Sequence, residues 1–209
     1  MDGVLVDSEA LQEAAERYVC ALHRIVVPEE VWHGFKGNTS KHIFGYINAR
    51  FGGGRFVVDE LIREKIEYYM REVVRGGLDP IPGSFDFLRF LGKLPQIRAL
   101  ALTTSNNRAI QRVVFDRYRL DAFFKVVVTG DDVTHGKPHP EPYQRTLKLL
   151  GAEPSKCLVI EDSDNGIISA KAAGCKVLAI TTTFPRKRLR DAGADYVVDT
   201  FVEAQTLFS

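Results

Sequence analysis

The chain has 209 residues, with 28 Lys and Arg side chains against 27 Asp and Glu, and a formal net charge of +1. This balance argues against a dedicated nucleic-acid-binding protein, which would carry a basic excess. Hydrophobic residues make up 45% of the chain and charged residues 26%, which predicts a globular protein with a buried core and argues against disorder.

The cysteines and the N-terminal residues indicate the compartment. Cys20, Cys157 and Cys175 are odd in number and share no C-x-x-C spacing, so we predict neither a disulfide framework nor a zinc knuckle. No basic and then apolar leader follows Met1, and no apolar run approaches the roughly 18 residues that span a bilayer. We therefore expect a soluble, cytoplasmic protein with no membrane and no nucleic-acid partner.

Residues 9–79 are expected to be helical. Apolar residues recur there at intervals of three and four, for example at Leu11, Ala14 and Tyr18. The FVV run at 56–58 is a weak strand candidate. The glycine-rich FGGG at 51–54 divides two helical stretches, and the stiff D-P-I-P-G turn at 79–83 suits a hinge.

From residue 98 onward, short apolar runs alternate with segments of helical length. The runs are ALAL at 99–102, KVVV at 125–128, CLVI at 157–160, KVLAI at 176–180 and YVV at 196–198. The helical segments between them are 107–118, 140–150, 165–173 and 185–192. Near-continuous apolar strands alternating with helices are typical of a parallel sheet covered on both faces. We therefore predict a doubly wound α/β fold.

Polar residues follow the first of these strands. Thr104, Ser105 and Asn106 lie immediately before a predicted helix. Hydroxyl groups and free backbone N–H groups at a helix N-terminus form an anion site, because both the N–H groups and the helix dipole favour phosphate. A plain N-cap explains the same residues and stays open as an alternative.

The segment G-K-P-H-P at 136–140 follows the second strand. Lys137, held between Gly and Pro, can present a charge to a phosphate or a carboxylate, although most lone lysines are solvated. His135 and His139 have the i, i+4 spacing of a metal pair. Gly136 and the prolines exclude the helix that would align the two rings, so we interpret both as loop histidines.

Glu161 and Asp162 end the third strand. Adjacent carboxylates at a strand end are costly unless a positive charge lies between them, and Mg²⁺ is the hard cation that carboxylates bind. An N-cap Asp beside a solvated Glu is the alternative. The basic R-K-R-L-R at 186–190 is expected to be the solvated face of a short helix and not a binding patch.

Four ordered motifs together carry a family resemblance: MDGVLVDSE, ALTTSN, GKPHPEPY and VIEDSDNGIISAKAAG. With them the chain resembles the haloacid dehalogenase superfamily of phosphohydrolases, in particular phosphoglycolate-phosphatase-like, sugar-phosphatase-like and β-phosphoglucomutase-like enzymes. The resemblance implies a Rossmann-like catalytic core formed by residues 1–8 and 83–209. It also implies an inserted helical cap domain, with its hinge, at residues 9–82.

The resemblance assigns roles to the residues of the first two motifs. It implies that Asp2 is the general acid/base, and that the Asp2 backbone carbonyl faces Mg²⁺. It implies that Thr104 binds the transferring phosphoryl group with help from Ser105 and Asn106.

It assigns roles to the third and fourth motifs as well. Lys137 would neutralise negative charge on the nucleophile and the phosphate. Asp162 would ligate Mg²⁺, with Glu161 behind it or holding a metal-bound water, so that Asp2, Glu161 and Asp162 form the expected metal group.

The first motif departs from the family pattern D-x-D-G. Met1 occupies the middle position, so the nucleophilic Asp would precede residue 1, together with the strand that carries it. In this fold that strand lies between the strands at 98–102 and 157–160. We expect a start assigned at an internal Met rather than a protein without a nucleophile.

The sequence therefore predicts a Mg²⁺-dependent phosphatase of a small phosphorylated metabolite that works through an aspartyl-phosphate. The loop at 35–41 is the candidate for leaving-group contacts, although it serves equally as an interhelical connection. A phosphomutase is an alternative that Gln12 weakens, because such enzymes tend to carry a His at this place. A dehalogenase is disfavoured by Asp2, and a non-catalytic phosphate-binding module would follow if the nucleophile is truly absent.

Overall fold

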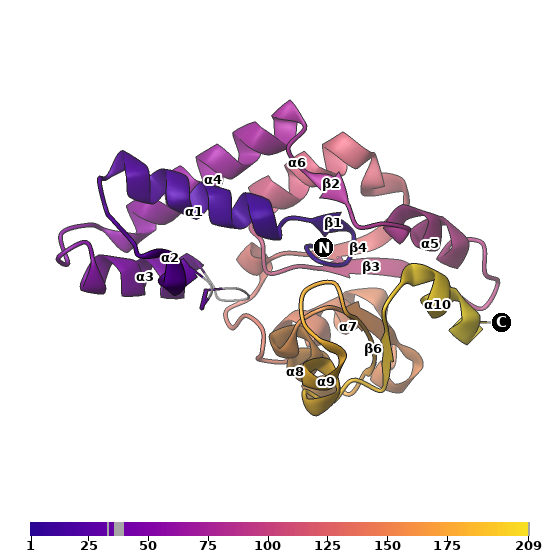
Figure 1. The fold of residues 1–209 in the computed structure, drawn as a ribbon. Helices are drawn as coiled ribbons and strands as arrows, with labels where there is room; N and C mark the ends of the chain where they lie inside the picture. The colour runs from indigo at the N-terminus through magenta and orange to yellow at the C-terminus, as the bar shows by residue number, and fades with distance from the viewer. Residues whose placement is uncertain (33, 36–39, 209) are drawn as a thin grey trace. The chain divides into compact units, whose positions relative to one another are not determined.

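A computed structural model describes residues 1–32, 34–35 and 40–208 of the chain (Figure 1). Their contacts divide the chain into two compact units. One unit is formed by Met1–Asp7 together with Asp79–Ser209, and the other by Ser8–Leu78. We refer to them as the sheet unit and the helical unit.

The helical unit contains α1 (Glu9–Leu22), α2 (Glu29–Trp32), α3 (Ser40–Arg50) and α4 (Val58–Arg75). Its core contains Val19, Phe44, Ile47 and Leu61, of which Phe44 and Ile47 are fully buried, whereas Tyr18, one of the periodic apolar residues, is exposed. The strand candidate at 56–58 is wrong, because Val58 begins α4 and Phe56 packs against this core. A buried ion pair joins Lys65 Nζ to Glu16 Oε1 at 3.0 Å.

The sheet unit contains the five predicted strands and the four predicted helices, each within one residue of its expected bounds. The strands are β3 (Leu100–Thr103), β4 (Phe124–Val128), β5 (Leu158–Glu161), β6 (Lys176–Ile180) and β7 (Tyr196–Val198). The helices are α6 (Arg108–Tyr118), α7 (Glu141–Leu150), α8 (Asp164–Ala172) and α9 (Arg186–Asp191). Two further helices, α5 (Ser84–Leu91) and α10 (Phe201–Gln205), were not expected from the sequence pattern.

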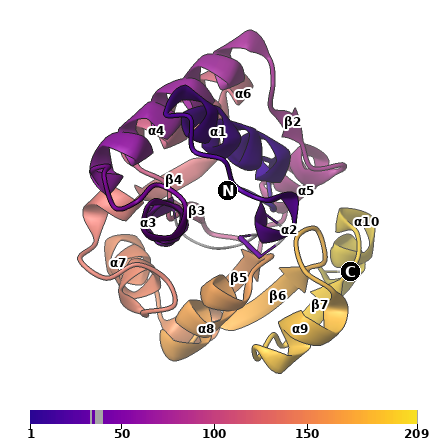
Figure 2. The ribbon, with the colours of Figure 1, turned by 60° about the vertical axis from the view of Figure 1, so that its left-hand side comes forward.

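The strands are parallel but form two ladders. β3 pairs with β4, and β5 pairs with β6, which pairs with β7 (Figure 2). No ladder joins β3 to β5 within the described residues. The interruption falls where the sequence analysis expects the strand that would precede Met1. A short antiparallel pair, β1 (Val6–Asp7) with β2 (Asp79–Pro80), lies where the chain passes between the two units.

Both faces of the β5–β6–β7 ladder are covered. Val177 and Ala179 of β6 pack into a cluster with side chains of α7, α8 and α9. Leu178 and Ile180, which point to the other face, pack with side chains of α5 and α10. A parallel sheet buried on both faces confirms the predicted α/β fold class.

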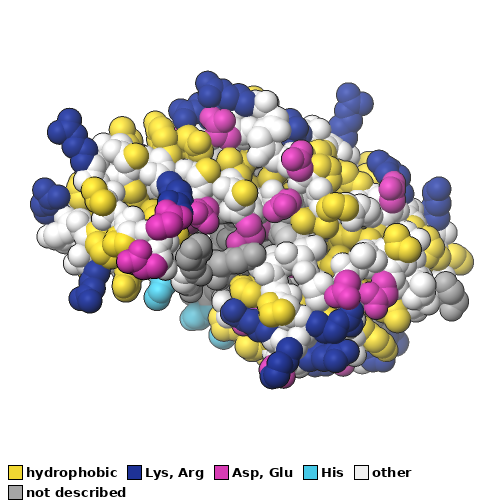
Figure 3. All heavy atoms as spheres, viewed as in Figure 1, with side chains coloured by type: hydrophobic (Ala, Val, Ile, Leu, Met, Phe, Trp, Pro, Cys, Tyr) yellow, Lys and Arg dark blue, Asp and Glu magenta, His cyan; other side chains and the backbone are white. Residues whose placement is uncertain are grey.

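The surface and the cysteines also follow expectation. The face in Figure 3 shows Lys and Arg side chains interleaved with Asp and Glu. In α9, Lys187 pairs with Asp191 and Arg188 with Asp164, so the basic run is a paired, solvated helix face. All three cysteines are free thiols. Within the described residues, none of the helices has the length and apolar character needed to span a bilayer.

Candidate active site

The N-terminal residues form a tight turn at the carboxyl ends of β3 and β5. Leu5 N donates to Met1 O at 2.8 Å, and Gly3 N donates to Val6 O at 2.9 Å. Gly3 has φ of +64°, a left-handed conformation that side-chain-bearing residues rarely adopt. The turn presents Asp2 to one ladder and Gly3 to the other.

Asp2 contacts the end of β3 through Asn106. Asn106 Nδ2 donates to Asp2 Oδ2 at 2.6 Å. The other oxygen, Oδ1, is buried and has no hydrogen-bond partner among the described residues. A buried carboxylate oxygen without a donor is costly, which makes Oδ1 a place where a proton, a ligand or a cation is stabilising.

Gly3 contacts the end of β5 through Asp162. A Cβ built on Gly3 would lie 1.9 Å from Asp162 Oδ2, so only glycine fits there. Thr183 Oγ1, which follows β6, donates to the same oxygen at 2.5 Å. Thr182 Oγ1 donates to Gly3 O at 2.5 Å. These contacts bring Asp2 and Asp162 to one end of the sheet.

The predicted phosphate site is a turn between β3 and α6. Thr104 is buried, and its Oγ1 accepts a hydrogen bond from Asn106 N at 3.2 Å. Ser105 is exposed. The N-cap of α6 is Asn107, whose side chain accepts from Ile110 N at 2.9 Å. The N-cap interpretation therefore applies to Asn107, and the three residues predicted to bind phosphate form the turn before it.

Lys137 reaches across to both strand ends. Its Nζ donates to Glu161 Oε1 at 2.5 Å and to Thr103 O at 3.2 Å. Both side chains of this ion pair are largely buried, with exposed fractions of 11% for Lys137 and 6% for Glu161. Lys137 is therefore not a solvated surface lysine, and it lies beside the carboxylates of β5.

The carboxylate of Glu161 is surrounded by donors. Besides Lys137, Oε1 accepts from Tyr143 Oη at 2.6 Å. Oε2 accepts from Asp162 N and Ser163 Oγ, both at 3.2 Å. With both oxygens engaged, Glu161 is directed at Lys137, and its prediction as a metal ligand stays a prediction.

The two neighbouring carboxyl groups have opposite pKa shifts. Burial raises the pKa of Glu161, but the charge and hydrogen bond of Lys137 outweigh burial and, with Tyr143, lower the pKa to about 2. Burial and then the negative charge of Glu161 raise the pKa of Asp162 to about 7. Among the described residues, Glu161 forms an ion pair with Lys137, whereas no ion pair of Asp162 is found.

The alternative interpretation of these two carboxylates, an N-cap Asp beside a solvated Glu, is wrong. Ser163, not Asp162, is the N-cap of α8, and its Oγ accepts from Gly166 N at 3.2 Å. Glu161 is not solvated, since only 5% of its surface is exposed. A Cβ on Gly166 would lie 2.0 Å from Glu161 Cδ, so the helix start packs directly on this carboxylate.

The residues of this site fit a hard cation in part. Asp2 supplies a buried oxygen without a partner, and Asp162 supplies a buried carboxylate whose pKa is raised. Both are the oxygen ligands that Mg²⁺ prefers. Asp2, Glu161 and Asp162 do not converge as three ligating atoms within 4.8 Å of one another in the described part of the chain. The arrangement favours Asp2 and Asp162 as ligands, with Glu161 acting through Lys137.

Two residues of the site were missed by the sequence analysis. Tyr143 lies in the GKPHPEPY motif, six residues after Lys137, and an aromatic hydroxyl there was a usable signal. Thr183 belongs to the TTT run at 181–183, which follows β6 as the other polar clusters follow their strands. The candidate leaving-group loop at 35–41 cannot be placed in this site, because residues 36–39 lie outside the described residues.

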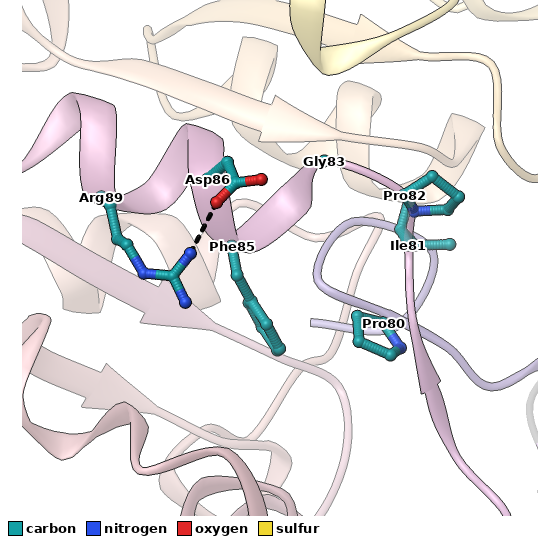
Figure 4. A pocket seen from close by; sticks show the side chains of 7 residues that line it. All are labelled: Pro80, Ile81, Pro82, Gly83, Phe85, Asp86 and Arg89. Carbon is teal, nitrogen blue, oxygen red and sulfur yellow. Dashed lines mark hydrogen bonds and ion pairs between the residues drawn. The ribbon is translucent and has the colours of Figure 1, made fainter.

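A shallow hollow elsewhere in the sheet unit contains none of the predicted site residues (Figure 4). Its volume is about 310 Å³, and it is lined around the start of α5 by Pro80, Ile81, Pro82, Gly83, Phe85, Asp86 and Arg89. Its only ion pair joins Arg89 to Asp86 at 2.6 Å. The hollow therefore does not coincide with the candidate site at the strand ends.

Comparison with known proteins finds similarity to a family of hydrolases. Residues 1–180 match the family of haloacid dehalogenase-like hydrolases. The chain is similar to a validoxylamine A 7'-phosphate phosphatase of Streptomyces hygroscopicus subsp. limoneus, with 30% identity over 196 residues that cover 92% of this chain and 88% of that protein. It is also similar to glycerol-1-phosphate phosphohydrolase 1 of Saccharomyces cerevisiae, with 36% identity over 127 residues, 56% of this chain and 49% of that one.

The fold has close counterparts among solved structures. One is a haloacid dehalogenase hydrolase of family IA, variant 3, from Entamoeba histolytica HM-1:IMSS, with a TM-score of 0.85. The match covers 97% of this chain and 92% of that chain at 23% identity, a level that supports the fold alone.

Proposed function

We propose that this chain, which belongs to the haloacid dehalogenase-like hydrolase family, is a Mg²⁺-dependent phosphatase of a small phosphorylated metabolite. The relatives described above act on phosphorylated small molecules by name, which supports the substrate class. The helical unit is the expected cap.

One observation carries the proposal: the N-terminal turn links the two strand ends. Asp2 is bonded to Asn106 beyond β3, and Gly3 is packed against Asp162 beyond β5. This gathers a carboxyl group for proton transfer, a phosphate-site turn and a carboxylate without a cation at the end of the sheet where open α/β folds bind ligands.

In the proposed reaction, Asp2 donates a proton to the leaving oxygen of the substrate and later accepts one from water. Asn106 holds Asp2 Oδ2, which leaves Oδ1 for that transfer. Thr104 and the neighbouring turn hold the phosphoryl oxygens. Lys137 faces the negative charge that develops on those oxygens, and Glu161 fixes the position of Lys137.

Asp162 and the backbone carbonyl of Asp2, the group that the family resemblance directs at the metal, would hold Mg²⁺, which when bound neutralises phosphoryl charge that carboxylates alone would repel. Thr183 orients Asp162 by donating to its Oδ2. Glu161 lies next to Asp162, but its negative charge is neutralised by Lys137. Asp162 would therefore be the carboxylate at the end of β5 whose charge is available to the cation.

The phosphoenzyme step needs a nucleophile, and the family pattern puts it at the position before Met1. We propose that this Asp and its strand belong to the functional protein, and that the strand completes the ladder between β3 and β5.

The test is an activity panel of sugar phosphates, glycerol phosphate, phosphoglycolate and nucleotides, with and without Mg²⁺, on protein that includes residues upstream of Met1. We expect phosphate release that EDTA abolishes and Mg²⁺ restores. The matched control for Asp162→Asn is Asp116→Asn, since Asp116 is an exposed carboxylate paired with Arg112 on α6. Release that is unaffected by Asp162→Asn would contradict the proposal.

A further inference from the structure

The loop that carries Lys137 also brings together His135, His139 and Glu141. One ligand atom from each lies within 4.8 Å of the other two. The two imidazole rings face each other, with centroids 4.7 Å apart and planes inclined by 35°. His135 Nδ1 lies 2.9 Å from Glu141 Oε2. None of these three residues belongs to the strand-end site.

A turn, and not a helix, aligns the two histidines. His139 N donates to Gly136 O at 3.0 Å, which closes the chain between the two rings. Pro138 and Pro140 restrict the backbone on either side of His139. Ser169 Oγ of α8 donates to His139 O at 2.6 Å and fixes the turn to the core. The reason for excluding a metal pair, that no helix can form, therefore does not apply.

Glu141 is fixed as firmly as the turn. Its Oε1 accepts from Thr134 N at 2.7 Å and its Oε2 from His135 N at 2.9 Å. Oε2 also lies 2.9 Å from His135 Nδ1, so backbone and ring contacts together fix the carboxylate beside the imidazole. Glu141 therefore offers a pre-positioned anionic oxygen beside two imidazoles.

We propose that His135, His139 and Glu141 bind a divalent transition-metal ion of the Zn²⁺ type, at a site separate from the proposed Mg²⁺ site. Two imidazole nitrogens and one carboxylate oxygen suit Zn²⁺, Ni²⁺ or Co²⁺, whereas Mg²⁺ prefers oxygen ligands alone. Three ligands leave a coordination position for water.

Small movements of the three side chains would bring their ligand atoms to coordination distance of one ion. Ligands bound at about 2.1 Å lie about 3–4 Å apart around one ion, so the three side chains need only a modest closure. His135 has room to move, since 64% of its side chain is exposed. The ion would replace the direct contact between His135 Nδ1 and Glu141 Oε2. It would also replace the long 3.2 Å hydrogen bond from Glu141 N to His139 Nδ1.

The test is calorimetric titration of Zn²⁺ into the protein in the presence of millimolar Mg²⁺, which occupies oxygen-only sites. We expect one Zn²⁺ per chain and at least a 10-fold loss of affinity in His135→Ala and in His139→Ala. Glu141→Gln keeps an acceptor for Thr134 N and removes the charge, so we expect a smaller but measurable loss. Exposed His42, in the helical unit, gives the matched control His42→Ala, with unchanged affinity.

Three further measurements separate this site from others. X-ray absorption of the Zn²⁺ complex should count two imidazole nitrogens and no sulfur, which excludes binding at Cys157. Asp162→Asn should bind Zn²⁺ as the unaltered chain does, so a failure of the Mg²⁺ proposal would leave this one standing. Zn²⁺ at 100 times its Kd should raise Tm by about 5–11 °C, and this shift should vanish in the His135→Ala/His139→Ala double variant. Unchanged Zn²⁺ affinity in that double variant would overturn the inference.

Discussion

The buried pair of Lys137 and Glu161 allows a structural role to be separated from a catalytic one. Lys137→Met keeps the length and the apolar stem of the side chain and removes its charge. Glu161 would then be a buried carboxylate whose remaining donors are Tyr143 Oη, Asp162 N and Ser163 Oγ. Glu161→Gln removes the charge from the other side, and the double variant removes both.

The size of the effect follows from the burial of both groups. Removing one partner of a buried ion pair costs about 3–5 kcal/mol, because the other charge stays buried without compensation. A pKa lowered from 4.5 to about 2 corresponds to about 3 kcal/mol in favour of the charged carboxylate, which agrees with the lower end of that range. Three donors remain around Glu161, so we expect Lys137→Met to lower the free energy of unfolding by about 3 kcal/mol. The double variant should recover most of this loss, because a neutral Gln can still accept from Tyr143.

The unaltered protein, Lys137→Met, Glu161→Gln and the double variant are compared by urea unfolding and by phosphatase kinetics. We expect turnover to fall by about 100-fold or more in Lys137→Met and to stay low in the double variant, because stability returns but the charge facing the phosphoryl group does not. The control is Lys156→Met, whose ion pair with Glu153 is exposed on both sides and should change the unfolding free energy by at most about 0.5 kcal/mol. If the double variant recovered turnover together with stability, Lys137 would be purely structural and the proposed role would be wrong.

Three further predictions follow from single contacts. Asp162→Asn should abolish Mg²⁺ binding in calorimetric titration while the protein stays folded, since the substitution relieves repulsion from Glu161; undiminished Mg²⁺ binding would contradict the assignment. Gly3→Ala should destroy activity and cost at least about 2 kcal/mol of stability in urea unfolding, because its Cβ meets Asp162 Oδ2 at a positive φ; a fully active, equally stable variant would show that the turn is not needed. Burial raises the pKa of Cys20 to about 12 and of Cys175 to about 11, so in the folded protein both thiols should react with a disulfide reagent at pH 8 far more slowly than after denaturation.

The secondary structure of the sheet unit could be predicted because its signals are local. Each strand is a short apolar run, and glycines such as Gly151 and Gly174 end the helices with a left-handed φ. Helix α5 was missed although Phe87, Leu88 and Leu91 have helical spacing. The D-P-I-P-G turn before it was interpreted as a hinge, and the residues that follow were not assigned to a helix. The strand candidate at 56–58 failed because tertiary packing of Phe56 outweighed β propensity.

The sequence analysis predicted which residues belong to the candidate site, but not which of them contact one another. Open α/β folds bind their ligands at the carboxyl ends of the strands, and this rule indicated Lys137 and Asp162. Which atom meets which depends on distant segments, as in the hydrogen bond of Asn106 to Asp2, 104 positions apart. The imidazole pair shows the same limit, because helical spacing was the wrong geometry to test for a turn.

The interruption of the sheet leads to the last prediction, that residues 1–209 by themselves do not form a phosphoenzyme. Asp2 is no substitute for the nucleophile, since a residue two places along an extended chain lies about 6–7 Å away, whereas attack needs the reacting oxygen within about 3.5 Å of phosphorus. Asn106 also holds Asp2 Oδ2 in another role. Intact-mass measurement with a rapid-quench assay for phosphoenzyme should find none in protein that begins at Met1 and should find it in protein extended upstream through an Asp. Phosphoenzyme in the shorter protein would refute the position assigned to the nucleophile.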